Sequence, residues 1–296
     1  MLIDHLSIIG VGLIGGSLAR ALRKAKLVNR VSACNRCEET LKKAIELDVI
    51  DDYSMNIEEA IAGADVVVIG TPLSVTEKLL PQIATALDKK TILTDVGSAK
   101  ASVVKAARAA MGDQFPRFVP GHPIAGTEKS GVEASFAELF IDHRVILTPV
   151  KETDSAAHQL ISDMWKAVGA EVIDLEVEHH DQVLAATSHL PHMLAYALVD
   201  CLAGMEEREE IFKYAAGGFA DFSRIASSSP EMWHDICIAN RDALLNTLSI
   251  FSEHIDQIKD AIEKEDSERL LKIFKRAKQA RDHFTISRKQ LRTTQE

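Results

Sequence analysis

The sequence has few cysteines, few aromatic residues and no long apolar run. Its four cysteines, in a chain of 296 residues, are too scattered for a disulfide framework, so reduced thiols are expected. No apolar run approaches the roughly 20 residues that span a bilayer. The start of the chain has an acidic Asp4 and neither a basic stretch nor a small-residue cleavage site, which predicts a strand rather than a signal peptide. We therefore expect a cytoplasmic protein with no membrane partner.

Basic residues are in the minority. The chain has 34 Lys and Arg against 44 Asp and Glu, and its net charge of -10 argues against a nucleic-acid or anionic-membrane surface. A few basic side chains can still line a pocket for an anion. The length allows two modest domains with a sizeable core that needs neither disulfides nor metals. The expected ligands are small molecules.

Apolar runs typical of strands alternate with amphipathic stretches in the first half of the chain. The candidate strands are LSIIG, VSACN, ADVVVIG, KTILTDV, RVILTPV and AEVIDL, with helical apolar spacing between them. This alternation predicts an α/β fold with a doubly wound, Rossmann-type parallel sheet over residues 1–175. Residues 176–296 show helical spacing without further strands, which predicts an all-helical second domain.

The first candidate strand runs directly into a glycine-rich turn. Gly10, Gly12 and Gly15 form a G-x-G-x-x-G motif, a spacing that lets the backbone approach a pyrophosphate at a helix N-terminus. A purely structural turn is the alternative, but the position in the first βαβ unit favours dinucleotide binding. The expected cofactor contacts are Gly10, Gly12, Leu13, Ile14, Gly15, Asn35, Arg36, Thr71 and Pro72.

The end of the second strand bears on the choice of cofactor. An acidic residue commonly stands there and accepts hydrogen bonds from the ribose of NAD, whereas this chain has Asn35 and Arg36. Both side chains can donate to the 2′-phosphate that a carboxylate would repel, so the sequence favours NADP, with NAD as the alternative. Arg36 could instead be a solvated residue that stacks on the adenine. Cys34 and Cys37 form a C-x-x-C pair, but no second pair completes a zinc site.

Two polar residues follow later strands of the predicted sheet. Ser98 lies at the carboxyl edge, where doubly wound sheets bind ligands, and is an active-site hydroxyl, the N-cap of the next helix, or both. His122 opens the glycine-rich stretch GHPIAGTEKSGVEASF, which is expected to form a loop over the cofactor. Because a lone histidine before a proline is more often structural, spacing alone does not make His122 catalytic.

The helical half holds further candidates. His189 and His192 are three residues apart, so helical spacing brings them to one face, but no third ligand stands at zincin spacing and no metal is expected. The segment EHHD before them is interpreted as a polar helix start. Downstream, Arg224 could cap a helix or pair with Asp221, and Trp233 could belong to the core.

Together these segments resemble the prephenate and arogenate dehydrogenases, including the broad-specificity cyclohexadienyl dehydrogenases. GVGLIGGSLARAL, DVGSAK, GHPIAGTEKSGVEASFAELF, TSHLPH and GGFADFSRIASSSPEMW match that family in content and order. The resemblance implies a helical C-terminal domain that forms a homodimer. It assigns His122 as acceptor of a hydrogen bond from the ring hydroxyl, Ser98 as its helper and Arg224 as anchor of a carboxylate. The pocket residues it implies are Glu128, His189, His192, Asp221 and Trp233.

The implied reaction is the oxidative decarboxylation of prephenate, arogenate or both, which gives 4-hydroxyphenylpyruvate or tyrosine. Hydride leaves C4 of the ring for the nicotinamide, the C4 hydroxyl loses its proton, and loss of carbon dioxide makes the ring aromatic. A neutral imidazole suits the base, so kcat/KM is expected to fall below pH 6 to 7. Alternatives are another two-domain hydroxyacid or imine reductase, with its catalytic base in the helical domain, and a non-catalytic protein that senses NADP.

Overall fold

The computed structural model describes residues 2–127 and 129–293, and the side chains of these residues up to position 286. The chain divides into two compact units, Met1–Leu244 and Leu245–Glu296. The first unit carries both sheets and every site residue predicted from the sequence that the structure describes. The second unit holds most of one long helix and all of another.

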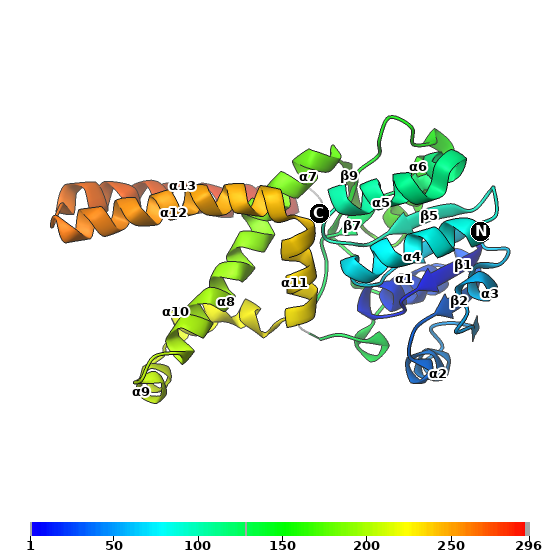
Figure 1. Cartoon of the computed structure of the whole chain (residues 1–296), viewed down its shortest axis with the longest axis horizontal. Coiled ribbons are helices and arrows are strands. Elements are labelled where there is room, and N and C mark those ends of the chain that lie inside the picture. Colours follow the sequence, from blue (N-terminus) through cyan, green and yellow to red (C-terminus); the bar gives the residue numbers. More distant parts are fainter. Residues whose placement is uncertain (1, 128, 294–296) are drawn as a thin grey trace. The chain divides into compact units, whose positions relative to one another are not determined.

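Six parallel strands form the main sheet of the first unit (Figure 1). Their order is β3-β2-β1-β4-β5-β6, the order of dinucleotide-binding sheets, with the reversal of direction between β1 and β4. The predicted Rossmann-type sheet is therefore confirmed. The strands are β1 (Ile3–Ile9), β2 (Val28–Cys34), β3 (Asp52–Tyr53), β4 (Val66–Ile69), β5 (Ile92–Asp95) and β6 (Phe118–Val119).

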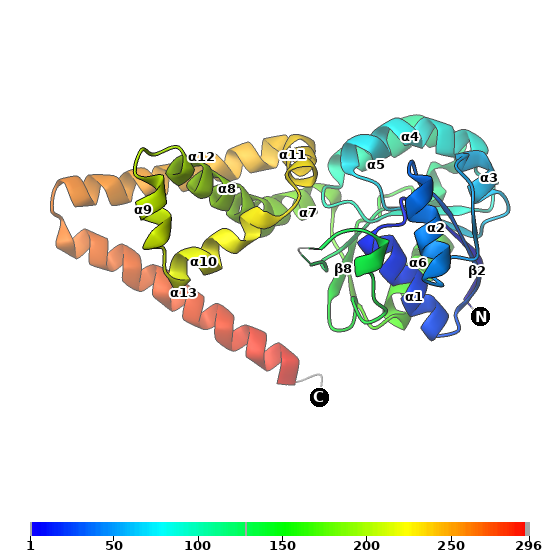
Figure 2. The same cartoon turned by 90° about the horizontal axis from the view of Figure 1, so that it is seen from below.

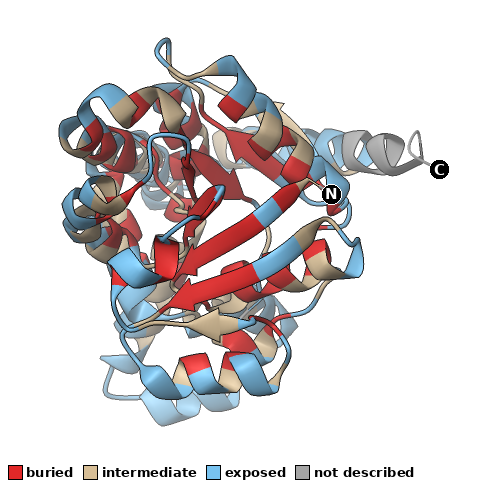
Figure 3. Cartoon of the chain, turned by 90° about the vertical axis from the view of Figure 1, so that its right-hand side faces the viewer, coloured by how far each residue is buried: buried red, intermediate tan, exposed pale blue. Residues whose placement is uncertain are grey.

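Helices cover both faces of this sheet, because its strands are apolar on both sides. Along β4, Val66 and Val68 pack with α1, α2 and α6, whereas Val67 and Ile69 pack with α3, α4 and α5 (Figure 2). Strands β4 and β5 are buried over their full length, and β1 is buried except at Asp4 (Figure 3). These helices are α1 (Leu13–Lys24), α2 (Glu38–Glu46), α3 (Ile57–Ile61), α4 (Leu73–Ala86), α5 (Ala101–Met111), followed by the 3₁₀ turn η1 (Gly112–Arg117), and α6 (Ser155–Ala167).

A second, three-stranded sheet corrects part of the sequence prediction. RVILTPV and AEVIDL were expected in the parallel sheet, but they form β8 (Arg144–Leu147) and β9 (Glu171–Asp174) of a separate sheet. Its first strand, β7 (Gly121–Pro123), runs antiparallel to β8. Pro120 separates β6 from β7 and has no N–H to donate, so the ladder of the main sheet ends there. A short 3₁₀ turn, η2 (Val132–Ala134), lies between β7 and β8.

From Val177 to Thr293 the chain is helical, as the sequence predicted, and contains no strand among these described residues. Nowhere in the described ranges is a helix both long and apolar enough to cross a membrane. The helical elements are α7 (Val177–Leu184), the π turn η3 (Ala185–His189), α8 (Leu190–Ala203), α9 (Arg208–Lys213), α10 (Gly217–Ser223), the 3₁₀ turn η4 (Arg224–Ser227), α11 (Pro230–Ala239), α12 (Arg241–Glu263) and α13 (Ser267–Thr293).

Candidate active site

The glycine turn joins β1 to α1, and each glycine has a separate reason to be there. Gly10 has a φ of 90°, and a Cβ on it would come within 2.8 Å of Gly70 C, so the turn needs glycine. A Cβ on Gly15 would lie 2.8 Å from Ile8 Cγ2, which shows how closely α1 packs on β1. At Gly12 a Cβ would meet nothing within 4 Å. The space in front of Gly12, at the start of a helix, fits a pyrophosphate.

Two more predicted cofactor contacts lie beside this turn. The Gly10 N–H donates to Cys34 O at 2.8 Å, so the end of β2, with half-buried Asn35 and exposed Arg36, adjoins the turn. Asn35 Oδ1 accepts from Cys37 N at 3.3 Å. Across the reversal point, Thr71 Cγ2 lies 2.8 Å from the position that a Cβ on Gly10 would take, and Pro72 is the N-cap of α4. All the predicted cofactor residues therefore gather at the carboxyl edge of the sheet.

A buried ion pair holds the next part of the site together. Lys100 and Asp95, which are 0 % and 1 % exposed, pair with each other, and Lys100 Nζ also donates to Gly121 O at 2.7 Å. Asp95 accepts from Gly97 N at 2.9 Å and from Gly121 N at 3.2 Å. The loop that carries Ser98 is thus tied to the strand that carries His122.

Neither Ser98 nor His122 has the local structure expected. Ser98 was a candidate N-cap of α5, but the helix begins at Ala101 without a side-chain cap from its own chain segment. Instead Asp181, from α7, accepts from Lys100 N at 2.8 Å and from Ala101 N at 2.9 Å. His122 was expected in a loop and lies in strand β7, with 8 % of its surface exposed.

His122 is linked to a second histidine and a carboxylate. His122 Nδ1 lies 2.9 Å from His180 Nε2, and His180 Nδ1 lies 2.8 Å from Asp181 Oδ1. Burial lowers the pKa of His122 well below its ordinary value of 6.5, and the charges of His180, Lys100 and His189 lower it further. Burial opposes ionisation of Asp181, but its bonds from His180 and the backbone of α5 hold the pKa of this carboxyl below its ordinary value.

The network continues from Asp181 into the remaining predicted pocket residues. Asn240 Nδ2 donates to Asp181 O at 2.8 Å and lies 3.0 Å from His189 Nδ1. The ring of Trp233 meets His189 edge-on, with centroids 6.0 Å apart, and stacks on His192 at 3.8 Å. Burial lowers the pKa of His192, and the charge of Arg224 lowers it too, which places Arg224 near this stack. Distant parts of the sequence therefore meet in one cluster.

Two nitrogens of this cluster are buried without a protein partner. They are His189 Nε2 and Trp233 Nε1. Because Asn240 Nδ2 donates to a carbonyl and faces His189 Nδ1, Nδ1 accepts and Nε2 carries the proton of His189. Burial is the main reason that the pKa of His189 is lowered to about 4, so this ring is neutral at cellular pH. The pair of unsatisfied donors suits an oxygen of a polar ligand.

Some residues of the site were missed and some were misassigned from the sequence. His180 and Asp181 belong to EHHD, which starts helix α7 as expected, but its simply polar character was wrong, since the buried residues of α7 are Val177, His180, Asp181 and Leu184. Their i, i+3, i+4, i+7 spacing is a signal for one buried face that could have revealed them. Asp221 and Arg224 are exposed in this single chain. Glu128 lies outside the described residues.

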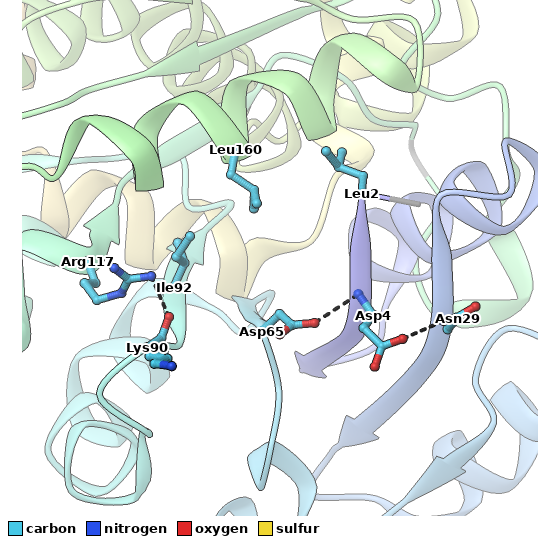
Figure 4. A pocket seen from close by; sticks show the side chains of 8 residues that line it. All are labelled: Leu2, Asp4, Asn29, Asp65, Lys90, Ile92, Arg117 and Leu160. Carbon is cyan, nitrogen blue, oxygen red and sulfur yellow. Dashed lines mark hydrogen bonds between the residues drawn. The ribbon is translucent and has the colours of Figure 1, made fainter.

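One cavity of the first unit lies away from this cluster. It has a volume of about 500 Å³ and lies at the amino ends of the strands, opposite the glycine turn (Figure 4). Two polar side chains that line it form hydrogen bonds with the backbone of adjacent segments: Asp65 accepts from Asp4 N and His5 N at 2.9 Å, and Arg117 donates to Lys90 O. Ligands of doubly wound sheets bind at the carboxyl edge, so this cavity is not the reaction site. Among the described residues no group of three His, Cys, Asp or Glu side chains is placed to hold a metal ion.

The sheet order and the open glycine turn at its carboxyl edge define a dinucleotide-binding protein of the Rossmann class. Residues 18–174 match the family model of the prephenate dehydrogenase nucleotide-binding domain, and residues 176–276 match the model of the prephenate dehydrogenase dimerization domain. The chain therefore belongs to the prephenate dehydrogenase family.

Individual relatives agree over nearly the whole chain. The cyclohexadienyl dehydrogenase of Zymomonas mobilis is 40% identical over 281 residues, which are 94% of each chain. The crystal structure of prephenate dehydrogenase from Aquifex aeolicus in complex with hydroxyphenyl propionate and NAD+ is 36% identical, with a TM-score of 0.89 over 95% of this chain and 98% of that one. The arogenate dehydrogenase of Synechocystis is 27% identical, with a TM-score of 0.80 over 95% and 99% of the two chains. The family resemblance seen in the sequence is confirmed.

Proposed function

We propose that the enzyme oxidatively decarboxylates prephenate, arogenate or both, with His122 as the base. The observation that carries this proposal is the position of the buried imidazole of His122. The preceding residue, Gly121, donates its N–H to Asp95 at the carboxyl end of β5, so His122 lies at the same edge of the sheet as the glycine turn. A proton acceptor is needed beside the nicotinamide site because the C4 hydroxyl must lose its proton as hydride leaves C4. The names of the three relatives support the two ring substrates.

The remaining pocket residues have roles that follow from their chemistry. Arg224 can bind a substrate carboxylate through two parallel hydrogen bonds and fix the ring relative to His122. The Nε2–H of His189 and the Nε1–H of Trp233 donate to substrate oxygens, which satisfies both groups. Ser98, half-buried on the loop held by Lys100, donates to the C4 oxygen. Glu128, His192 and Asp221 complete the pocket by the same family assignment.

The cofactor is held by the glycine turn and the ends of β2 and β4. The backbone from Gly12 to Gly15 receives the pyrophosphate, and Thr71 and Pro72 border the same site. When bound, the nicotinamide supplies the hydride acceptor. We propose NADP as the preferred cofactor, with NAD also possible, because Asn35 and Arg36 present no carboxylate to the 2′ position.

The protein functions as a homodimer in this proposal. The boundary near residue 175 divides a dinucleotide-binding part from a helical substrate and dimerisation part. Several large apolar side chains of α12 and α13 are more than two-fifths exposed in the single chain, an arrangement that marks interaction surfaces. They are Leu245, Ile250, Ile255, Ile262, Leu271, Phe274, Phe284 and Ile286.

The test is to mix the enzyme with prephenate or arogenate and either cofactor and to follow formation of reduced nicotinamide. We expect turnover of at least one ring substrate. Replacement of His122 by Asn should lower kcat by about 10²- to 10⁴-fold with cofactor affinity unchanged, because only a proton acceptor is lost. His179→Asn, an exposed position in α7, is the control. Cofactor binding without turnover of either substrate would favour the NADP-sensing alternative.

The pH profile is a second test of His122. The sequence predicted that kcat/KM falls below pH 6 to 7, but the lowered pKa of His122 moves this limb to more acidic pH. The wild-type profile should therefore stay flat through pH 6.5 and fall with slope one only below it, as the imidazole becomes charged. A fall centred at or above pH 6.5 would contradict the burial argument.

A further inference from the structure

We propose that His180 and Asp181 are positioning residues that hold His122 in the one tautomer that can act as a base. This inference rests on the proposed catalytic role of His122. All three side chains are buried, with 8 %, 0 % and 4 % of their surfaces exposed for His122, His180 and Asp181. They form one line of hydrogen bonds, with contacts of 2.9 Å and 2.8 Å.

The direction of these hydrogen bonds follows from the carboxylate end. Asp181 receives two backbone N–H groups at the start of α5, and its pKa is lowered, so it is ionised and can only accept. His180 Nδ1 must then donate to Asp181. In a neutral imidazole the other nitrogen accepts, so His180 Nε2 accepts from His122 Nδ1. This leaves a lone pair on His122 Nε2, the only ring nitrogen of His122 that can face substrate.

The same line of bonds stabilises the charge that appears during the reaction. The O–H bond of the C4 hydroxyl breaks, its proton bonds to His122 Nε2, and the electron pair stays with the oxygen to become the ring carbonyl as hydride leaves C4. The new imidazolium keeps its Nδ1–H on His180, whose own Nδ1–H stays on Asp181. No second proton transfer is required, as in the Ser-His-Asp arrangement, where the carboxylate orients the histidine and stabilises its charged form.

The surroundings of His122 explain why a carboxylate is needed. The charged or titratable groups that face it are His180 from α7, Lys100 from the start of α5 and His189 from the π turn. A positive charge on any of the three would oppose one on His122, and Lys100 is already paired with Asp95. Asp181 is the carboxylate that reaches His122 through hydrogen bonds, and its capping of α5 prevents it from turning away.

The first experiment reads the tautomer directly in the wild-type enzyme. Protein labelled with ¹⁵N-histidine, with cofactor bound and substrate absent, is studied near pH 7.5 by long-range ¹H–¹⁵N correlation, which distinguishes protonated from unprotonated ring nitrogens. Signals are assigned by comparison with His122→Asn and His180→Gln. We expect His122 to carry its proton on Nδ1 and His180 to be neutral with its proton on Nδ1. A proton on His122 Nε2, or a doubly protonated His180, would overturn the proposal.

The second experiment removes the hydrogen bonds between His122, His180 and Asp181 but keeps the hydrogen bonds by which Asp181 caps α5. His180→Phe leaves Asp181 bonded to the backbone of α5, so we expect kcat to fall by about 10²-fold or more while KM changes by less than about threefold. His180→Gln supplies an amide oxygen that can accept from His122 Nδ1, so it should recover at least about tenfold of the loss. His179→Phe, at an exposed position of the same helix, controls for the added ring.

The outcomes separate this inference from the proposed function. If His122→Asn is inactive but His180→Phe turns over within threefold of wild type, the positioning role is wrong and His122 remains the base. If His122→Asn itself turns over normally, the proposed function fails first. A lower melting temperature of His180→Phe with unchanged kcat would show a purely structural role and would also overturn the inference.

Discussion

The buried, neutral state of His189 leads to a quantitative prediction about stability in acid. His189 is 1 % exposed, its Nδ1 is occupied by Asn240, and its Nε2 has no protein partner. A second proton on this ring would be a buried charge that the nearby carboxylate of Asp181 offsets only in part. Burial lowers its pKa to about 4, against about 6.5 in the unfolded chain. A depressed histidine pKa means that its contribution to stability is complete above pH 6.5 and is lost progressively as the pH falls toward 4.

The size of the loss can be calculated. One pKa unit corresponds to about 1.4 kcal/mol, so the shift of His189 limits the total loss to roughly 3 kcal/mol. Between pH 7.5 and pH 5, linkage between the two pKa values gives a loss of about 2 kcal/mol. This is a large share of the 5–15 kcal/mol typical of folded domains.

The assay is urea unfolding of wild type and His189→Asn at several values between pH 7.5 and pH 5, at one protein concentration because oligomers unfold in a concentration-dependent way. Asn is chosen because its Oδ1 can still accept from Asn240. The variant should be less stable at pH 7.5, and its deficit should shrink by about 2 kcal/mol at pH 5, since it has no imidazole to protonate. His179→Asn should track wild type. Parallel loss in wild type and His189→Asn, within about 0.5 kcal/mol, would show that His189 is not held neutral by burial.

Three further substitutions test the remaining proposals. Arg224→Ala should weaken substrate binding by roughly 2 to 5 kcal/mol in steady-state kinetics, with Lys at this position recovering only part, whereas normal binding with a much lower melting temperature would indicate a capping role. Asn35→Asp should shift the ratio of kcat/KM for NADP and NAD toward NAD. A carboxylate about 4 Å from the 2′-phosphate repels it by up to about 4 kcal/mol at an effective dielectric near 20. A change in this ratio of less than about threefold would refute the NADP assignment. Phe274→Glu should reduce the sedimentation coefficient toward that of a monomer, while Lys272→Glu on the same helix should not. An unchanged dimer in Phe274→Glu would exclude this position from the interface.

Local sequence was sufficient for the main sheet and the cofactor turn. The apolar runs are buried on both faces because a parallel sheet is covered by helices, and that requirement is visible in consecutive apolar letters. Gly10, Gly12 and Gly15 serve a turn of only six residues, so their spacing alone predicts the structure. The switch to helical spacing after residue 175 was also visible, because the spacing of apolar residues in a helix depends only on neighbours along the chain.

Tertiary structure alone decided how the chemistry is arranged. No local pattern separates RVILTPV from the strands of the main sheet. Its place in a second sheet depends on its pairing with β7, the strand that follows Pro120. His122 and His180 are 58 positions apart, and Asp181 caps a helix that begins 80 positions earlier. The sequence by itself determined the fold class, the dinucleotide turn and the candidate base, because these depend on neighbours along the chain. The partners, burial and pKa of that base depend on the meeting of β7, α5 and α7, since hydrogen bonds and desolvation act through space between segments distant in sequence.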